Sequence, residues 1–224
     1  MEDLKNLNCL LPKTKSLLLE MIDSCDFLDK YVLVGGSALA LHICHRKSED
    51  LDFFTYSDNF DKKEIFDYIG QFTNKEILNQ TDEQIDLLLD GVKVTFFNAK
   101  WSFLKPNIIN RFNLASIESI AAMKVNVLFL RAKFRDYYDL YFLVKKRMDI
   151  REIFEYSLNI VDGITFKLFA VALVYIDDIE DDNIEYLEPI EILDKIKIRD
   201  FFQKKLQNDT RKVEFLKHLL PKNS

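Results

Sequence analysis

The sequence predicts an α/β (α+β) protein: an N-terminal α/β unit that runs to about residue 110 and a helical C-terminal half. Three observations lead to this prediction. A short apolar run ends in a Gly-Gly pair before an apolar helix, a hairpin pattern covers residues 84–98, and apolar residues recur at helical spacing from Ser116 onward. The chain has 224 residues, of which 48% are hydrophobic, so it can bury a full core. We expect two domains, 1–110 and 111–224.

The N-terminal elements follow from periodicity and turn signals. The segment QIDLLLDGVKVTFFN is the clearest hairpin, because Asp90-Gly91 is a type I′ turn signal between two β-rich runs. A two-residue turn there would place Asp86 opposite Thr95 and leave Ile85, Leu87 and Leu89 facing apolar partners. Before the hairpin we expect, in order, helix, strand, helix, strand, surface helix and short strand at residues 13–25, 31–34, 37–45, 51–56, 61–72 and 76–79.

The C-terminal half reads as helices followed by a charged tail. Helices are expected at 117–130, 134–146, 150–159 and 166–175, with Ser116 as N-cap of the first and the last apolar enough to be buried. Residues 176–194 hold nine acids and no Lys or Arg, whereas residues 195–224 hold nine bases and three acids. We expect a solvated acidic loop and then an amphipathic surface helix, whose basic side is a candidate surface for nucleic acid or an acidic partner.

Composition excludes several classes of protein. The net charge of −6 is not that of a nucleic-acid coat protein, and 19 Phe with 9 Tyr argue against disorder. The N-terminal sequence is acidic and interrupted, unlike a secretory signal, and the longest uncharged apolar run, Leu168 to Ile176, is too short to span a bilayer. Three Cys without CxxC spacing predict neither a disulfide framework nor structural zinc, and the HICH segment (His42, His45) is expected to pack rather than bind metal. A soluble, reduced, cytoplasmic protein is expected.

The stretch VLVGGSALALHICHRKSEDLDFF, residues 32–54, carries the most chemistry. If Asp50 and Asp52 occupy positions i and i+2 of a strand, both carboxylates project from one face. Their repulsion is relieved by a divalent cation, and Mg²⁺ is commonly held by one or two carboxylates together with substrate phosphates. The alternative is an Asp-x-Asp pair on a solvent-facing edge strand, but the apolar residues on both sides of the pair favour a functional site.

The Gly35-Gly36-Ser37 turn supplies the complement to this acid pair. Glycine lets the backbone approach a phosphate closely, and the start of the following helix offers unpaired amides. Ser37 could donate its hydroxyl to a phosphate oxygen. A Gly-Gly pair alone is usually only a tight turn, yet a phosphate cradle beside a metal-binding acid pair is the apparatus for nucleotidyl or phosphoryl transfer.

Two sequence blocks resemble a known family. GGSALALHICHRKSEDLDFF resembles the signature of the nucleotidyltransferase superfamily with the DNA polymerase β-like fold, which implies a mixed β-sheet core flanked by helices. More narrowly, HRKSEDLDFF resembles the AbiEii/AbiGii toxin family, and IAAMKVNVLFLRAKFRDYYDLYFL resembles the second block of that family. The residues at matching positions are Arg46, Ser48, Asp50, Asp52, Lys124, Arg131, Lys133, Asp136 and Asp139.

This resemblance implies a Mg²⁺-dependent enzyme that moves a nucleotide from an NTP to an acceptor, RNA or a tRNA 3′ end, as the toxin of a toxin–antitoxin or phage-defence pair with a cognate antitoxin. Asp50 and Asp52 would bind metal, and the implied catalytic residues are Asp50, Asp52 and Lys124. The implied nucleotide-binding residues are Gly35, Gly36, Ser37, Arg46, Ser48, Lys124, Arg131, Asp136 and Asp139.

Spacing leaves the role of the second block open. In one continuous helix, Lys124, Arg131 and Arg135 would form a basic stripe that clamps a triphosphate, with Asp136 or Asp139 orienting it. The alternative is a set of exposed charges on an amphipathic helix, in which the two acids pair locally with Arg135.

One position departs from the superfamily pattern. The third acid expected on a neighbouring strand is replaced by Thr95, and Asp86 could place a catalytic carboxylate there from across the hairpin. The alternative is an ordinary Asp–Thr hydrogen bond. Two other functions therefore stay open. One is a small-molecule nucleotidyltransferase, because the acidic segment would suit a cationic acceptor, and the other is a decayed nucleotide-binding module. Trp101 is expected to be a packing anchor, or else a residue that stacks on a base.

Overall fold

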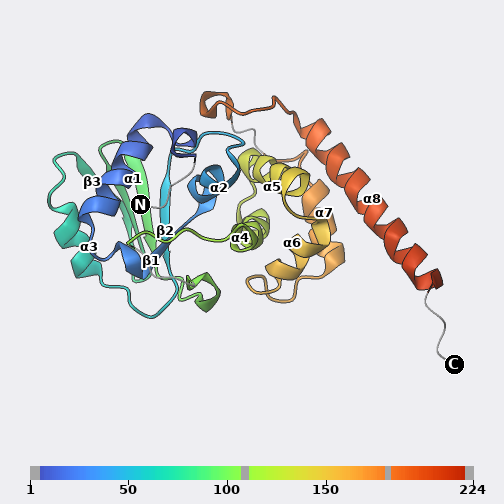
Figure 1. Ribbon diagram of the computed structural model, residues 1–224, viewed down its shortest axis with the longest axis horizontal. Coiled ribbons are helices and arrows are strands. Elements are labelled where there is room, and N and C mark those ends of the chain that lie inside the picture. Colours follow the sequence, from blue (N-terminus) through green and yellow to red (C-terminus); the bar gives the residue numbers. More distant parts are fainter. Residues whose placement is uncertain (1–5, 107–110, 180–182, 220–224) are drawn as a thin grey trace. The chain divides into compact units, whose positions relative to one another are not determined.

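The computed structural model describes residues 6–106, 111–179 and 183–219, and the side chains of 210–219 are not described (Figure 1). The chain forms two compact units. Unit 1 comprises Met1–Ile120 and Ile184–Ile190, and unit 2 comprises Ala121–Asn183 and Glu191–Ser224. The domain boundary predicted after residue 110 falls beside residues 107–110, which lie outside the described residues, and it stays a prediction.

Unit 1 is built on a five-stranded sheet with the order β1-β2-β5-β4-β3. Strands β2 and β5 run parallel, while the β1–β2, β5–β4 and β4–β3 pairs are antiparallel. The sheet is therefore mixed, as predicted. Its strands are β1 (Tyr31–Val34), β2 (Leu51–Thr55), β3 (Lys75–Gln80), β4 (Gln84–Leu89) and β5 (Val92–Phe97).

The β4–β5 hairpin has the predicted register. Asp90 and Gly91 have φ of 48° and 84°, and a type I′ turn requires positive φ at both central residues. Asp86 consequently pairs with Thr95, and Leu87 pairs with Val94. The turn chemistry alone fixed this alignment, because a two-residue loop leaves no freedom to slip.

The sheet buries one apolar face. Leu51 and Phe53 of β2 are fully buried, and the Phe53 ring stacks on Phe96 of β5 with centroids 5.5 Å apart. Asp52 and Thr95 belong to the alternate positions of these strands and thus to the opposite face. The helices and 3₁₀ turns of this unit are α1 (Pro12–Ser24), α2 (Gly35–Ile43), α3 (Lys62–Ile69), η1 (Leu7–Cys9), η2 (Leu28–Lys30), η3 (Ser102–Leu104) and η4 (Glu185–Leu187).

Helix α2 begins two residues earlier than expected. The Gly-Gly pair forms its first turn, with Val34 as N-cap, instead of a separate turn before Ser37. Glycine has low helix propensity, so the apolar periodicity marked the helix only from Ser37 onward. The predicted phosphate cradle would therefore be the N-terminus of the helix itself.

Cys9 and Cys44 form a disulfide, which corrects the expectation that none is present. The amide of Ser48 donates to the Cys9 carbonyl at 3.0 Å, and the Leu11 amide donates to the Ser48 carbonyl at 2.9 Å. The disulfide itself joins η1 to the C-cap residue of α2. Cysteine spacing cannot reveal such a bond, because the two residues are 35 positions apart and meet only through the tertiary fold.

The helices predicted for the C-terminal half all form, within a residue or two at their ends. They are α4 (Ile117–Leu130), α5 (Phe134–Lys146), α6 (Ile150–Ser157), α7 (Phe166–Val174) and α8 (Lys195–Leu219), the last being the long helix near the C-terminus in Figure 1. Ser116 caps α4 as predicted, since its hydroxyl accepts from the Ser119 amide at 3.2 Å. Inside unit 2, Tyr141 of α5 packs on Phe201 of α8 with ring centroids 4.4 Å apart.

Helix α7 is less buried than its composition suggested. Phe169 and Leu173 are buried, but Leu168 and Val171 are each 53% exposed. Apolar composition could not indicate which side of the helix meets the rest of the unit, so the prediction of a buried helix was wrong. In the described part of the chain, no helix is both long and apolar enough to cross a membrane.

Candidate active site

The two acids lie at the start of β2. Asp50 is the last residue before the strand, rather than inside it, and Asp52 is the second strand residue. Both are half-buried, while Leu51 between them is fully buried. Asp52 therefore belongs to the sheet face opposite the core, as the alternation predicted.

The two glycines of α2 bring its backbone directly against these side chains. A Cβ added at Gly35, whose φ is +72°, would lie 2.6 Å from Oδ2 of Asp52. A Cβ at Gly36 would lie 2.9 Å from Nη2 of Arg46 and 3.1 Å from Oγ of Ser48. Only glycine permits such close approach. The fold thus brings the Gly-Gly pair close to Asp52, Arg46 and Ser48; their roles in binding phosphate and metal stay predictions.

Ser37 has a different partner from the one expected. Its side chain is only 1% exposed, and its hydroxyl donates to the backbone carbonyl of Asp50. This hydrogen bond joins the first turn of α2 to the residue that precedes β2. The position of Ser37 therefore supports the geometry of the acid pair, and its predicted contact with phosphate stays a prediction.

The chemistry of the donor set fits a magnesium ion that shares its ligands with a substrate. Asp50 and Asp52 offer two carboxylates, and no group of three or more His, Cys, Asp or Glu side chains among the described residues is placed to hold a metal ion. Mg²⁺ is usually bound by one or two carboxylates, with waters and substrate phosphates completing its octahedral coordination. A phosphate at the start of α2 would supply the missing oxygens.

A polar row crosses the sheet from Asp52. Asp52 pairs with Thr95 across the parallel β2–β5 pair, and Thr95 pairs with Asp86 across the hairpin. The Thr95 hydroxyl donates to Oδ1 of Asp86 at 2.8 Å, and Oδ2 accepts from Gln84 at 2.8 Å and from Asn79 at 3.3 Å. The ordinary Asp–Thr hydrogen bond is therefore formed.

Asp86 is held away from Asp52. Its side chain is 7% exposed, and two strand spacings of about 4.8 Å separate β4 from β2, or roughly 10 Å between the backbones. Thr95 lies between Asp86 and Asp52 in the register of the sheet. Because Thr95 gives its proton to Asp86, its oxygen is presented as a hydrogen-bond acceptor.

The loop that carries Arg46 and Ser48 is held by a segment that sequence reasoning missed. Within unit 1, residues 184–190 return to this loop: the Lys47 amide donates to the Leu187 carbonyl at 2.6 Å, and the Ile190 amide donates to the His45 carbonyl at 3.0 Å. The side chains reinforce this pairing, with Tyr186 to Glu49 at 2.6 Å and Lys47 to Glu188 at 2.6 Å. This part of the acidic segment is thus a built support, not a solvated loop, while its residues 180–182 lie outside the described residues.

Unit 2 contains the second predicted group of residues. Nζ of Lys124 lies 2.9 Å from Oδ1 of Asp136 and 2.6 Å from Oδ2 of Asp139, and the three side chains are 8%, 0% and 0% exposed. Arg131 is 56% exposed and lies 3.7 Å from Asp136. The backbone amide of Lys133 also donates to Asp136, at 3.2 Å.

The chain breaks between α4 and α5, so the residues of this cluster come from two helices rather than one stripe. A buried ammonium between two buried carboxylates is an ion network in which each partner compensates the desolvation of the others. The cluster holds the Lys124 side chain in place between the two carboxylates.

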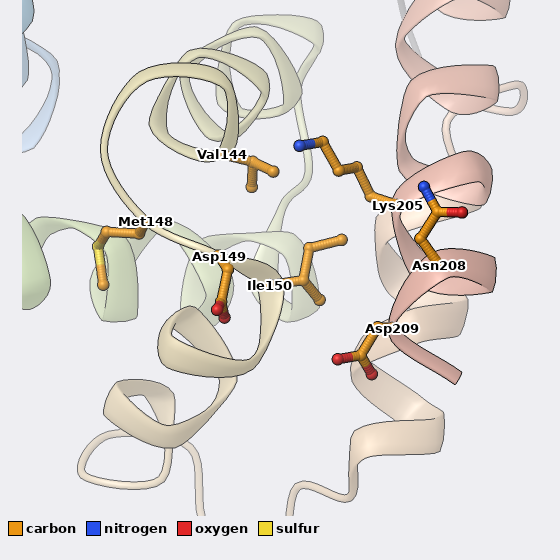
Figure 2. A pocket seen from close by; sticks show the side chains of 7 residues that line it. All are labelled: Val144, Met148, Asp149, Ile150, Lys205, Asn208 and Asp209. Carbon is orange, nitrogen blue, oxygen red and sulfur yellow. The ribbon is translucent and has the colours of Figure 1, made fainter. Parts of the chain in front are cut away.

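A separate cavity of about 410 Å³ lies in unit 2, between the α5–α6 turn and α8 (Figure 2). Figure 2 shows Lys205 reaching from α8 toward Val144. Arg151 pairs with Asp209 of the cavity wall at 2.7 Å. The lining residues are Val144, Met148, Asp149, Ile150, Lys205, Asn208 and Asp209. None of them is a predicted site residue.

Solved structures share this fold. A structure described as "Crystal structure of JHP933 from Helicobacter pylori" matches with a TM-score of 0.51 and 20% identity, over 94% of this chain and 99% of that one. One described as "Crystal structure of putative nucleotidyltransferase from H. pylori" matches with a TM-score of 0.52 and 22% identity, over 92% and 98%.

The chain also shares sequence with known proteins. The uncharacterized protein aq_aa25 of Aquifex aeolicus (strain VF5) is 30% identical over 203 residues, which cover 88% of this chain and 96% of that protein. The family described as "Nucleotidyl transferase AbiEii toxin, Type IV TA system" matches residues 17–103 and 104–211. The chain therefore belongs to the AbiEii family of nucleotidyltransferase toxins of type IV toxin–antitoxin systems.

Proposed function

We propose that this nucleotidyltransferase moves a nucleotide from an NTP to an RNA acceptor, a tRNA 3′ end being the expected target, in a Mg²⁺-dependent reaction. One observation carries the proposal: the start of α2 approaches Asp52 so closely that a Cβ at Gly35 would lie 2.6 Å from its carboxylate. A helix N-terminus binds phosphate, and a carboxylate binds metal. A phosphate-binding helix start and a metal-binding carboxylate would therefore lie close enough to act on one triphosphate.

The residues around the glycines have distinct roles in this proposal. The backbone amides of Gly35 and Gly36 and the side chains of Arg46 and Ser48 bind the triphosphate. Ser37 positions Asp50 through the hydrogen bond to its carbonyl. Asp50 and Asp52 would hold Mg²⁺, which would supply positive charge beside the phosphates.

Thr95 and Asp86 are proposed to handle the proton of the attacking hydroxyl. The Thr95 oxygen accepts that proton as its own proton passes to Asp86 along the 2.8 Å hydrogen bond. The oxygen of the acceptor then forms a bond to the α-phosphorus, and the bond to pyrophosphate breaks. Asp86 thus serves as the base in place of the acid that the superfamily carries at the position of Thr95.

In unit 2, we propose that Lys124 and Arg131 contact the nucleotide or the leaving pyrophosphate. Asp136 and Asp139 keep the Lys124 ammonium in a fixed position, which is what a preorganised cation requires. A cognate antitoxin is the expected protein partner, and the cytoplasm, where NTP and RNA are available, is the expected location.

Labelled nucleotide transfer tests this function. The protein is incubated with Mg²⁺ and each α-labelled NTP, and the label is scored separately in RNA, protein and small-molecule fractions. Label in RNA that is lost in Asp52→Asn supports the proposal, and label in a small molecule would replace the acceptor. Because Thr95 stands in place of an acid, a binding module is the second candidate; NTP binding without pyrophosphate release from any acceptor would establish it.

A further inference from the structure

Four aromatic side chains form a connected cluster in unit 1, next to the acid pair. The ring centroids of Phe54 and Phe97 lie 5.0 Å apart, and those of Phe54 and Trp101 lie 5.9 Å apart. Trp101 stacks on Phe103 with centroids 5.4 Å apart and an interplanar angle of 26°. All four side chains are only partly buried, so the cluster is not part of the closed core.

The cluster continues the polar row along the same strands. Phe54 follows Asp52 by two residues on β2, Phe97 follows Thr95 by two residues on β5, and the two Phe are register partners. Residues two apart on a strand share a face and lie roughly 7 Å apart. The rings of Phe54 and Phe97 therefore occupy the same face as Asp52, two residues further along the strands.

Hydrogen bonds fix the segment that carries the tryptophan. The Trp101 amide donates to the Thr55 carbonyl at 3.3 Å, and the Lys100 amide donates to the Thr55 hydroxyl at 2.9 Å. Thr55 is fully buried at the end of β2. The indole is therefore held against the sheet by backbone contacts and does not need a ligand to take this position.

The geometry of phosphoryl transfer indicates which substrate lies on this face of the sheet. Attacking and leaving oxygens lie roughly in line on opposite sides of the phosphorus. The phosphate-binding start of α2 follows β1, on one side of β2, so pyrophosphate leaves on that side. The attacking hydroxyl must then come from the side of β5, where Thr95 and Phe97 lie.

We propose that Phe54, Phe97, Trp101 and Phe103 form a stacking platform for the terminal unpaired bases of the acceptor RNA. The proposal rests on the proposed function for the position of the acceptor, and on the aromatic cluster for its chemistry. Aromatic side chains bind single-stranded nucleic acid by stacking on base faces without sequence preference. Three exposed lysines suit a phosphate backbone: Lys93 on β5, and Lys100 and Lys105 on the segment that follows this strand. Lys100 also lies 3.7 Å from Asp58.

Trp101 provides a direct signal, because it is the single Trp of the chain. The full-length protein is titrated with a short single-stranded RNA while Trp fluorescence is recorded. A stacked base quenches the indole, so we expect saturable quenching by single-stranded RNA and little quenching by a blunt RNA duplex or by an NTP alone. Equal quenching by the duplex, quenching by the NTP alone, or no quenching by any single strand would overturn the proposal.

Variants test the platform by anisotropy of labelled RNA, which does not depend on the indole. Trp101→Ala and Phe54→Leu should each weaken binding about ten-fold, and Trp101→Phe should restore most of the affinity. Phe129→Ala, at a 43% exposed aromatic in unit 2, serves as the matched control and should bind like the unchanged protein. Unchanged binding by both Phe54→Leu and Trp101→Ala would refute the platform.

Failure of the aromatic platform and failure of the proposed nucleotide transfer to RNA give different results. Asp52→Asn should lose nucleotide transfer but keep the fluorescence quenching, because the aromatic rings do not depend on the metal. A protein that quenches with single-stranded RNA but labels only a small molecule would keep the platform and remove the RNA acceptor.

Discussion

Replacing Gly35 by Ala tests the contact on which the active site depends. The new Cβ would lie 2.6 Å from Oδ2 of Asp52, whereas ordinary contact begins near 3.4 Å, so the carboxylate must move by about 0.8 Å. Displacement of a catalytic group by about 1 Å lowers activity by roughly 10²-fold. The left-handed φ of +72° adds a cost of about 1–2 kcal/mol to the folded state, which corresponds to a decrease in Tm of roughly 2–8 °C for a chain of this size.

Gly163 provides the control for this experiment. Its φ is +69°, nearly that of Gly35, but a Cβ there would meet nothing within 4 Å. Gly163→Ala therefore carries the same backbone strain without touching the site. Both variants should lose similar stability in thermal melts, and only Gly35→Ala should lose nucleotide transfer. Equal transfer rates in the two variants would show that Asp52 need not stay where the fold places it.

Three further predictions follow from the same contacts. Asp52→Asn should lower nucleotide transfer by roughly 10²-fold or more with little change in Tm, because it removes a proposed metal ligand from a half-buried site; a variant that keeps its transfer rate contradicts the metal role. Lys124→Met should lower the free energy of unfolding by about 3–5 kcal/mol in urea titrations, since it removes the buried ammonium that lies between two fully buried carboxylates. Lys63→Met, on the exposed side of α3, should change the free energy of unfolding by no more than about 0.5 kcal/mol. Burial raises the pKa of the Cys25 thiol from 9.0 to about 12, so the unfolded chain releases this proton at lower pH than the folded chain. The contribution of this thiol to stability should be complete below pH 9 and fall as pH rises toward 12. The urea midpoint of Cys25→Ala should depend less on pH in that window than the midpoint of the unchanged protein, and an identical dependence would contradict the assignment.

Features encoded by neighbouring residues could be predicted from the sequence. The Asp90-Gly91 turn fixed the hairpin register, and with it the pairing of Asp86 with Thr95. Ser116 fixed the start of α4, and the acid pair with its glycines identified the candidate site. Each of these depends on backbone conformations within a few residues, which is where sequence patterns are informative.

Features that join distant parts of the chain could not be predicted. Nothing local indicates that Cys9 meets Cys44, or that residues 184–190 pair with the loop at Lys47. The hydrogen bond from the Ser37 hydroxyl to the Asp50 carbonyl could not be predicted, because the two residues become adjacent only in three dimensions. Likewise, the composition of α7 could not show that Leu168 lies at the surface.

The return of residues 184–190 to the loop at Lys47 has a consequence for synthesis of the protein. The ribosome completes the N-terminal strands long before it reaches this segment, so a nascent chain carries the loop of Arg46 and Ser48 without its later partners. We expect a toxin that becomes competent only when translation is nearly finished. A fragment of residues 1–179 should bind NTP more weakly than the whole chain, and adding a peptide of residues 183–192 in trans should strengthen that binding; a fragment with full affinity would exclude such late activation.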